Sequence, residues 1–479
     1  MVGAGAAGLY AALSAAREGA RVVLVSRSPL AESASFWAQG GIAAALAVYD
    51  SPEGHLADTV AAGRGTTRAS AARVLCDESP AAVRDLEALG VRFDADRHGS
   101  LALGLEGGHS VRRVVHAGGS ATGQRITREL SALVAQDERI EVLEGTTAAA
   151  LWCHEGRCVG LRAEPTRGGG GTAAVIAARA TVLATGGAAA LWERTTNPRG
   201  AIGAGVTLAE HGGAKLADLE MTQFHPTALL HDDPRHDGFL ITEAIRGEGA
   251  TLIDEDGERF VDELAPRDQV ALAVQGVLTA GGRVRLDMRR IDMRGFPNVA
   301  RALRRAGLDP AREPVPVAPA AHYTMGGVAV DLDGRSSIEG LFAVGETACS
   351  GLHGANRLAS NSLAECFVFG RRAGLAGAAC PPLPADPGAP PATGPDPVPP
   401  RPTRAALWRG AGLHRTAEGL HALLEDPFPL ARRIAAAALA REESRGAHQR
   451  QDFRVLDPRL DGMHVTLTAG DPPRLERWE

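Results

Sequence analysis

The stretch Gly3-Ala4-Gly5-Ala6-Ala7-Gly8 decides the fold, because it has the GxGxxG spacing at the start of an expected helix that includes Leu9–Glu18. Glycines at these positions allow a tight turn and let the backbone approach a pyrophosphate closely. The N-terminus of the helix then offers free N–H groups and a positive dipole to the phosphates. A short apolar run, Arg21–Val25, follows at the distance expected for the next strand. This order of loop, helix and strand predicts a Rossmann-like domain that binds a dinucleotide.

The first strand of this unit is nearly absent, because only Met1 and Val2 precede the glycine loop. We expect codons upstream of Met1 to encode a short apolar strand. The alternative is a sheet that lacks its central strand.

Two later glycine turns favour FAD over NAD as the dinucleotide. Thr185-Gly186-Gly187 and Gly345-Glu346 each follow an expected strand. Glu346 is placed to accept a hydrogen bond from a ribose hydroxyl. The acidic residue that usually ends the second strand of an NAD-binding unit is replaced by Ser26-Arg27, which argues against NAD.

The chain has 479 residues, too many for one hydrophobic core, so we expect an α/β protein of several domains. A Rossmann-like FAD-binding domain is expected in two parts, 1–218 and 324–380, around an inserted α+β capping domain at 219–323. The Pro-rich run 381–402 is predicted to be an extended linker. A C-terminal helical domain is expected at 403–479, with a tail from Gln451 that is strand-like in composition. The β-rich stretch before the insertion is expected to form strands at Ile140–Leu143, Ala148–His154, Cys158–Ala163, Ala173–Ala177 and Thr181–Ala184, with a turn at Gly168–Gly171.

Composition and charge exclude several classes of function. The net charge of −6 argues against a nucleic-acid partner. No apolar run approaches the roughly 18 residues that a membrane span needs, and the N-terminus lacks the pattern of a secretory signal. The six cysteines form no CxxC pair, so we expect no metal site and no disulfide framework. A reducing cytoplasm is the compartment that fits this usage.

A set of cationic and polar residues suits a small dicarboxylate. The set comprises His225, Thr242, Glu243, Arg267, His322 and Arg357, each in a segment with loop signals. Guanidinium groups match carboxylates in a bidentate geometry, and imidazoles add hydrogen bonds. Taken singly, each residue has an ordinary alternative: Arg267 can pair with Asp268 in a surface loop, the histidines can be structural, and Thr242 can cap a helix.

Seven segments make the prediction specific. They are Ser35–Ile42, Glu106–Ser110, Gln223–Thr227, Thr242–Gly249, Leu264–Asp268, His322–Val328 and Gly351–Leu363. In this order the chain resembles, over roughly residues 1–450, the L-aspartate oxidase branch of the succinate dehydrogenase and fumarate reductase flavoprotein superfamily. Two features favour this branch. The covalent-flavin histidine of membrane succinate dehydrogenases is absent from Ala34–Trp37, and the Glu106 segment is similar to that of the oxidases.

The resemblance implies that C2 of L-aspartate loses a hydride to the flavin, which gives iminosuccinate. It implies dioxygen as the acceptor, with hydrogen peroxide as product, or fumarate as the alternative acceptor. This reaction is the first step of de novo NAD biosynthesis, with quinolinate synthase as an expected downstream partner. FAD is expected to be bound non-covalently.

The resemblance also implies the roles of individual residues. Arg267 is expected to transfer the proton, through Glu243 or Asp268, because a guanidinium does not titrate readily. His225, His322, Arg357 and Thr242 are expected to bind the substrate carboxylates, and Glu106 its amino group. Implied FAD contacts are Gly3–Gly8, Arg27, Ala34, Ser35, Phe36, Trp37, Ala38, Gln39, Gly40, Gly41, Gly186, Glu346, Ser362 and Leu363.

Two other functions stay open at this point. One is a soluble fumarate reductase or succinate dehydrogenase-like flavoprotein, and the other is a flavin-binding protein without turnover. The second is suggested by the short first strand and by Ala204, which stands where the family usually has a cofactor-contacting aspartate. A side-chain methyl accepts no hydrogen bond, so weaker FAD binding is expected there.

Overall fold

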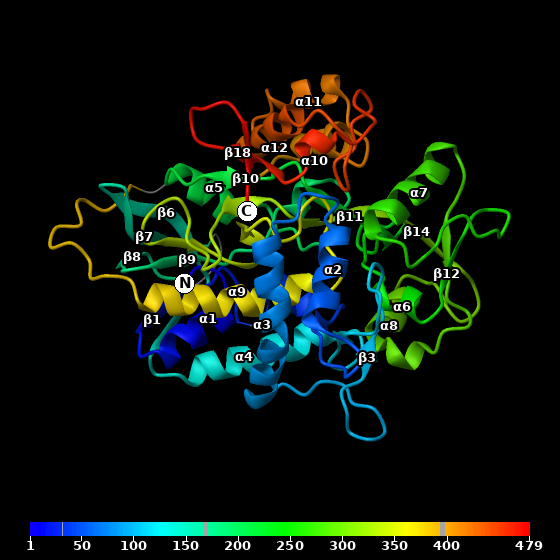
Figure 1. Cartoon of the computed structure of the whole chain (residues 1–479), viewed down its shortest axis with the longest axis horizontal. Helices are drawn as coiled ribbons and strands as arrows, with labels where there is room; N and C mark the ends of the chain where they lie inside the picture. The colour runs from blue at the N-terminus through cyan, green and yellow to red at the C-terminus, as the bar shows by residue number, and fades with distance from the viewer. Residues whose placement is uncertain (31, 167–170, 393–397) are drawn as a thin grey trace.

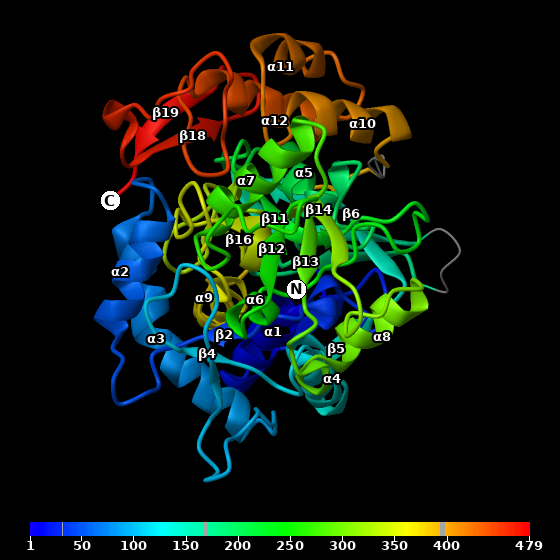
Figure 2. The same ribbon diagram turned by 90° about the vertical axis from the view of Figure 1, so that its right-hand side faces the viewer.

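The computed structural model describes residues 1–30, 32–166, 171–392 and 398–479. Most of the expected turn at 168–171 and part of the expected linker at 381–402 therefore lie outside the described residues. The chain forms three regions (Figures 1 and 2). The N-terminal region contains the elements before residue 222 together with those from 327 to 378, the inserted region contains the elements from 222 to 324, and the C-terminal region contains the elements from 401 onward. In the described part of the chain, no helix is both long and apolar enough to cross a membrane.

A parallel sheet with strand order β5-β1-Val2-β9-β16 lies at the base of the N-terminal region. Val2 bridges Val25 of β1 and Leu183 of β9, so the run before the glycine loop occupies the central position of the sheet. The alternative of a sheet without its central strand is therefore wrong. The strands are β1 (Val22–Val25), β5 (Ile140–Leu143), β9 (Thr181–Leu183) and β16 (Leu341–Ala343).

Helices cover one face of this sheet. Helix α1 (Ala6–Arg17) is rich in Ala, a strong helix former, and Gly19 follows it with a positive φ of 81°. Helix α9 (Asn361–Ala378), from far along the sequence, packs along α1, and the two run side by side in Figure 1. The other helices of this region are α2 (Pro52–Ala62), α3 (Ala69–Ala88), α4 (Thr122–Gln136) and α5 (Ala204–His211), with the 3-10 turns η1 (Ala34–Trp37), η2 (Ala189–Leu191) and η4 (Gly345–Thr347).

Three smaller sheets complete the N-terminal region. An antiparallel sheet contains β6 (Thr146–His154), β7 (Arg157–Pro165) and β8 (Ala174–Ala177). A second contains β2 (Ile42–Ala43), β4 (Val114–Val115) and β3 (Leu103–Gly104). A third is mixed and begins with β17 (Ala348–Cys349), β15 (Gly327–Ala329) and β10 (Leu216–Ala217).

The inserted region has a hydrophobic core of its own, built from residues between 229 and 317. Its sheet has the order β11-β14-β13-β12, and Figure 1 shows it to one side of the N-terminal region. The elements are β11 (Thr222–Leu229), α6 (Ala244–Gly247), β12 (Thr251–Ile253), α7 (Arg267–Thr279), β13 (Arg285–Asp287), η3 (Met293–Gly295), α8 (Pro297–Arg305) and β14 (Val315–Thr324).

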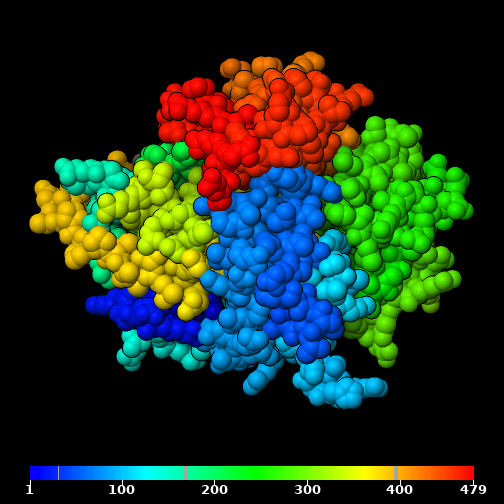
Figure 3. All heavy atoms as spheres, viewed as in Figure 1, coloured from blue at the N-terminus to red at the C-terminus, as the bar shows by residue number. Residues whose placement is uncertain are grey.

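The C-terminal region begins with helices and ends with strands. Its elements are α10 (Arg401–Gly410), α11 (Ala417–Leu423), α12 (Pro429–Ala440), η5 (Pro458–Leu460), β18 (Met463–Leu467) and β19 (Arg474–Arg477). Strand β18 pairs with β10. The pairing covers the edge of β10, which would otherwise present unpaired backbone groups. The α-helices of this region end at Ala440, and the tail from Gln451, which was expected to be strand-like, contains β18 and β19. Figure 3 shows this region covering one end of the molecule.

A buried ion pair and a buried carboxylate–imidazole contact tie the C-terminal region to the rest of the chain. Arg441, directly after α12, donates to Glu220 at 2.8 Å, and both side chains are fully buried. His464 of β18 lies 2.5 Å from Asp218. Because breaking a buried pair leaves an uncompensated charge, these contacts fix the position of the region.

The close packing of α9 on α1 depends on glycine at position 374. A Cβ atom there would lie 2.6 Å from the carbonyl oxygen of Ala11. We expect Gly374→Ala to lower the free energy of unfolding by roughly 1–3 kcal/mol, because overpacking pushes the helices apart. Thermal unfolding of the FAD-loaded protein measures it.

Gly377→Ala, in the same helix, is the matched control. A Cβ atom there meets only ordinary contacts, at 3.4 Å from Ala180. Alanine is the better helix former, so the control protein should unfold at the same or a higher temperature. Equal destabilisation by the two substitutions would contradict the role given to position 374.

Candidate functional site

One cavity of about 620 Å³ runs from the glycine loop to the inserted region. Its volume lies in the range of small-molecule and cofactor sites. All but two of the expected site residues line it: Gly3, Ala4, Gly5, Ala6, Ala7, Arg27, Ala34, Ser35, Trp37, Ala38, Gln39, Gly40, Gly41, Glu106, Gly186, His225, Thr242, Glu243, Arg267, His322, Glu346, Arg357, Ser362 and Leu363. Segments far apart in the sequence therefore form a single site.

The two exceptions are Gly8 and Phe36. Gly8 lies inside α1, where a Cβ atom would come within 1.9 Å of the Gly3 carbonyl oxygen. Gly8 therefore lets α1 pack closely on the Gly3 turn and does not itself line the cavity. The Phe36 ring packs edge-on against Trp37 and lies under Arg128, whose guanidinium carbon is 5.6 Å from the ring centre.

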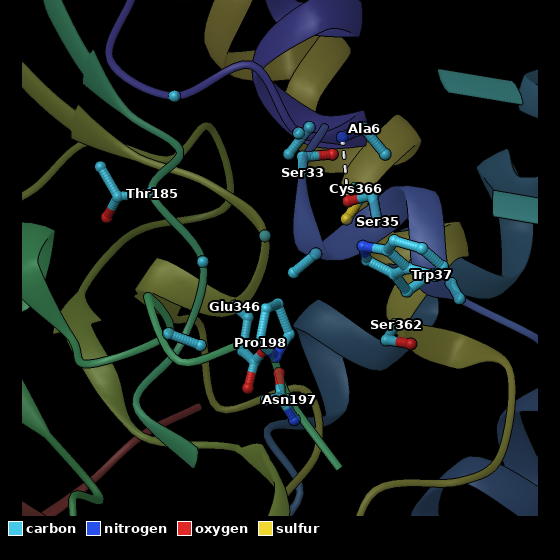
Figure 4. Close-up of a pocket in the computed structure, with 18 of the residues that line it drawn as sticks. Ala6, Ser33, Ser35, Trp37, Thr185, Asn197, Pro198, Glu346, Ser362 and Cys366 are labelled. Carbon is cyan, nitrogen blue, oxygen red and sulfur yellow. Dashed lines mark hydrogen bonds between the residues drawn. The ribbon is translucent and has the colours of Figure 1, made fainter. Parts of the chain in front are cut away.

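One end of the cavity has the features of a dinucleotide site. Gly3 has a φ of 104°, and a Cβ atom there would lie 2.3 Å from the Ala184 carbonyl oxygen, so only glycine fits this turn. The first-turn N–H groups of α1 have no partner within the helix, and Ser35 Oγ accepts from the N–H of Ala6 at 3.1 Å. Figure 4 shows this bond, with Trp37 and Ser362 on one side of the pocket and Thr185 on the other. The donors and the close backbone fit a pyrophosphate.

Glu346 lies at the middle of the cavity, and Figure 4 labels it near Asn197 and Pro198. Its Oε1 accepts from the backbone N–H of Thr324 at 2.8 Å. Burial raises the pKa of Glu346 to about 7. Within the described residues its Oε2 makes no hydrogen bond, so that oxygen is free to accept one from a ligand.

The two histidines lie on paired strands of the inserted region. His225 is on β11 and His322 is on β14, and their ring centres are 5.0 Å apart. Burial lowers the pKa of each imidazole well below its ordinary value, and the nearby Arg267 adds to the effect. Both rings are therefore neutral. Both rings line the cavity, as expected of residues that belong to one site.

The hydrogen bonds of His225 fix which of its nitrogens carries the proton. The backbone N–H of Thr227 donates to His225 Nδ1 at 3.3 Å. Because a backbone N–H can only donate, Nδ1 is the acceptor and Nε2 carries the proton of the neutral ring. On the other strand, His322 Nδ1 lies 2.7 Å from the Thr196 hydroxyl. Neither Nε2 has a hydrogen-bond partner in the described part of the chain, and both rings line the cavity.

Arg357 is a buried cation without a carboxylate partner among the described residues. Its side chain lies in the loop before α9, and the residue is 3% exposed. The guanidinium lies over the Tyr323 ring, 4.4 Å from its centre, and Nη1 donates to Ser362 Oγ at 3.2 Å. Burial, together with repulsion from Arg267, lowers the pKa of Arg357 to about 10. A buried, unpaired charge is costly, so this group calls for an anion from the cavity.

Arg267 is the first residue of α7, and its partners differ from the surface-loop alternative. Its Nε donates to Glu243 at 2.5 Å and its Nη1 donates to Gln223 at 3.1 Å. Asp268 instead pairs with Arg64, at 2.8 Å. The neighbour of Arg267 is therefore Glu243, and the expectation that named Asp268 as a second candidate is wrong.

Gln223 links the two arginines, and sequence reasoning did not identify it as a site residue. Its side-chain nitrogen donates to the Arg357 carbonyl oxygen at 2.8 Å, while its oxygen accepts from Arg267. An amide side chain carries an acceptor oxygen and a donor nitrogen without charge, so Gln223 can accept from Arg267 and donate to the Arg357 carbonyl oxygen at the same time. The sequence signal that could have identified Gln223 is its position at the start of the Gln223–Thr227 segment.

Glu106 is buried, and two groups contact its carboxylate. The Ser360 hydroxyl donates to it at 2.6 Å, and His116 Nε2 lies 3.4 Å away. Although burial alone would raise it, the pKa of Glu106 is lowered to about 2 by His116 and Ser360. The Ser360 hydroxyl oxygen also accepts from the N–H of Gly41, and Ser360 has a left-handed φ of 60°. A strained residue therefore joins the glycine-rich loop to an ionised carboxylate.

Thr242 precedes α6 but does not cap it. The N-cap position is Glu243, and no side chain caps this helix. The helix-cap alternative is therefore wrong, and Thr242 lines the cavity instead.

Comparison with known proteins places this site in a family. The family model described as an FAD binding domain matches residues 1–363, and the one described as fumarate reductase flavoprotein C-term matches residues 420–476. The L-aspartate oxidase of Mesorhizobium japonicum is 45% identical over 100% of this chain and 96% of its own length. That of Caulobacter vibrioides is 45% identical over 98% and 96%. The chain belongs to the L-aspartate oxidase family.

Solved structures agree with this membership in the wider flavoprotein superfamily. A quinol–fumarate reductase solved with menaquinol molecules has a TM-score of 0.87 and 30% identity, and covers 100% of this chain and 97% of its own. Mycobacterium smegmatis Sdh1 in complex with UQ1 has a TM-score of 0.84 and 29% identity, covering 100% and 94%. The expected α/β architecture with a Rossmann-like flavin domain is confirmed.

Proposed function

We propose that this chain oxidises L-aspartate at C2 to iminosuccinate with non-covalently bound FAD. Dioxygen is reduced to hydrogen peroxide, or fumarate to succinate, and the reaction is the first step of de novo NAD (pyridine nucleotide) biosynthesis. The observation that carries the proposal is the buried Arg357 guanidinium, unpaired within the described residues, beside two neutral imidazoles in the cavity that reaches the glycine loop.

The chain holds FAD through the wall of the cavity. We assign the pyrophosphate to Gly3–Ala7 and the N-terminus of α1, and a ribose hydroxyl to Glu346. Ala34 stands in the segment where a covalent-flavin histidine would lie, which supports non-covalent binding. When bound, FAD accepts a hydride and passes two electrons to the acceptor. Ala204 lines the same cavity and offers no side-chain acceptor.

The substrate carboxylates are assigned to the cationic and polar end of the cavity. Arg357 would bind one carboxylate with its free Nε and its Nη atoms, and the Thr242 hydroxyl and the His225 Nε2–H would donate to the carboxylates. His322 completes the wall opposite His225. Holding both carboxylates fixes C2 relative to the flavin, which is the orientation that hydride transfer needs.

Two carboxylates of the protein have different roles in this proposal. Glu106 is ionised and faces the cavity, so it complements the ammonium group of aspartate. Glu243 accepts from Arg267 Nε and is 1% exposed, so it can exchange a proton with that guanidinium. Arg267 is therefore the proton-transfer group and Glu243 its relay. Fumarate has no ammonium group, and the position of Glu106 favours the oxidase over a fumarate reductase.

The free state of all six cysteines supports a reducing, cytoplasmic location. We also propose quinolinate synthase as the consumer of the product, because an imine hydrolyses readily in water and benefits from prompt use.

The purified, FAD-loaded protein tests the function directly. We expect it to be yellow and to release hydrogen peroxide with L-aspartate in air, and to release none with succinate. Activity with succinate alone would favour the succinate dehydrogenase-like alternative. A yellow protein inactive with both would favour flavin binding without turnover.

Arg267→Leu tests the proton-transfer role. We expect turnover of L-aspartate to fall at least ~100-fold, the typical contribution of a positioned proton donor or acceptor. The flavin absorption spectrum should stay, because FAD is held mainly at the other end of the cavity. Peroxide release and the visible spectrum measure the two effects.

Arg259→Leu is the control for this substitution. Arg259 also pairs with a glutamate of the inserted region, Glu263, but its side chain is 60% exposed and does not line the cavity. Activity close to that of the unchanged protein is expected. Unchanged turnover in Arg267→Leu would remove that residue from the mechanism.

Glu106→Gln tests recognition of the amino group. We expect kcat/KM for L-aspartate to fall by about 10- to 100-fold, because a charged hydrogen bond contributes roughly 1.5–3 kcal/mol. Fumarate reduction with an artificial electron donor should change by less than about threefold. Steady-state kinetics with each substrate measures both, and equal losses would contradict the role of Glu106.

A further inference from the structure

Two cysteines stand opposite each other at the end of the hairpin formed by β6 and β7. In the strand register Cys153 faces Cys158, and His154 faces Arg157 next to the turn. Both cysteines are free. The turn residues Glu155 and Gly156 have φ values of 47° and 79°, as in the tight turns that join two strands through two residues.

The hydrogen bonds of the hairpin bring the two side chains close. The pair next to a two-residue turn is hydrogen-bonded, so the Cys153–Cys158 pair is of the other kind. In agreement, the Cys158 amide donates to Glu339 at 2.7 Å, away from β6. Residues in such non-hydrogen-bonded pairs have Cα atoms about 4.5 Å apart, within the range that a disulfide spans.

The thiols already interact. The neighbouring Cys153 thiol lowers the pKa of Cys158 to about 7. The Cys158 sulfur also lies 3.4 Å from the Gly160 carbonyl oxygen. Cys158 is buried and Cys153 is exposed, so a small oxidant reaches the pair from the Cys153 side. A thiolate next to a second, accessible thiol is the arrangement of a redox-active dithiol.

We propose that Cys153 and Cys158 are a modification site, which a hydroperoxide converts to an intrachain disulfide across the hairpin. One thiolate attacks the O–O bond of hydrogen peroxide, hydroxide leaves, and a sulfenic acid forms. The second thiol attacks that sulfur, an S–S bond forms, and water leaves. Two thiols and one peroxide thus give one disulfide and two waters, and the product is the same whichever cysteine reacts first.

The proposed function supplies an oxidant within the same molecule. The proposed function releases hydrogen peroxide, and the base of the same hairpin, Thr146–Ala148, lines the cavity. The disulfide gives the peroxide a reversible target, whereas a cysteine without a partner is oxidised to irreversible acids. This source rests on the proposed function, but the chemistry of the cysteine pair does not.

Trypsin makes the disulfide visible, because it cleaves after Arg157, between the two cysteines. The fragments are Ile140–Arg157 and Cys158–Arg162. FAD-loaded protein without aspartate is treated with hydrogen peroxide, its remaining thiols are alkylated, and the digest is analysed by mass spectrometry. We expect the two fragments to appear as one species that is two hydrogens lighter than their sum. Its amount should rise at least ~10-fold over untreated protein, and dithiothreitol should separate it.

Two variants complete the experiment. Cys158→Ser should lose the linked species, and its Cys153 fragment should gain oxygen atoms instead. Cys380→Ser, which removes a partly exposed thiol elsewhere, should give the linked species as before. If both fragments of the unchanged protein stay separate after peroxide, the proposal is wrong.

A second arm identifies the source of the peroxide. FAD-loaded protein with its cysteines reduced turns over L-aspartate in air, with and without catalase. Linked fragments that catalase suppresses support oxidation by released product. The protein could release peroxide during turnover and still form the link only when peroxide is added. That result would overturn the released product as the oxidant, while the modification site would stand. Failure to release peroxide at all would count against the proposed function instead.

Discussion

The site depends on one electrostatic constraint, which is a buried guanidinium that no carboxylate of the described chain neutralises. Arg357 lies over an aromatic ring and next to a second arginine, and its pKa is already lowered. The imidazoles opposite are neutral, so they donate without adding repulsion. A doubly negative substrate supplies the negative charge that the protein does not place beside Arg357. Glu243 pairs with Arg267 for the same reason, since two unpaired guanidiniums side by side would repel.

The fold meets this constraint by bringing distant segments together. The inserted region contributes the two histidines and Arg267, and the segment before α9 contributes Arg357 and Ser360. Ser360 reaches Glu106 across 254 positions of sequence, and it also accepts from the glycine-rich loop. Glu106 is thereby connected, through Ser360, to Gly41 of the glycine-rich loop. Gly374 contributes to this arrangement because it lets α9, which follows the Arg357 segment, approach α1 closely.

Much of this was predictable from sequence, for physical reasons that differ between residues. Strand β5 has the predicted bounds, since the apolar run Ile140–Leu143 has a turn on each side. The motif residues fell in one cavity because they are local signatures of a shared geometry. Gly8 and Phe36 were misplaced, because a linear motif does not show which way a side chain points. Gln223, Ser360 and the bridging position of Val2 depend on long-range contacts, which no local pattern contains.

The most direct measurement is a crystal structure of the FAD-loaded protein with bound fumarate. The account predicts that one carboxylate lies within hydrogen-bond distance of the Arg357 guanidinium. The other should lie near Thr242, with His225 Nε2 donating to the ligand and the carbon chain facing the flavin. A fumarate bound elsewhere, or an Arg357 that pairs with a carboxylate of the protein while the cavity holds only FAD and water, would contradict it.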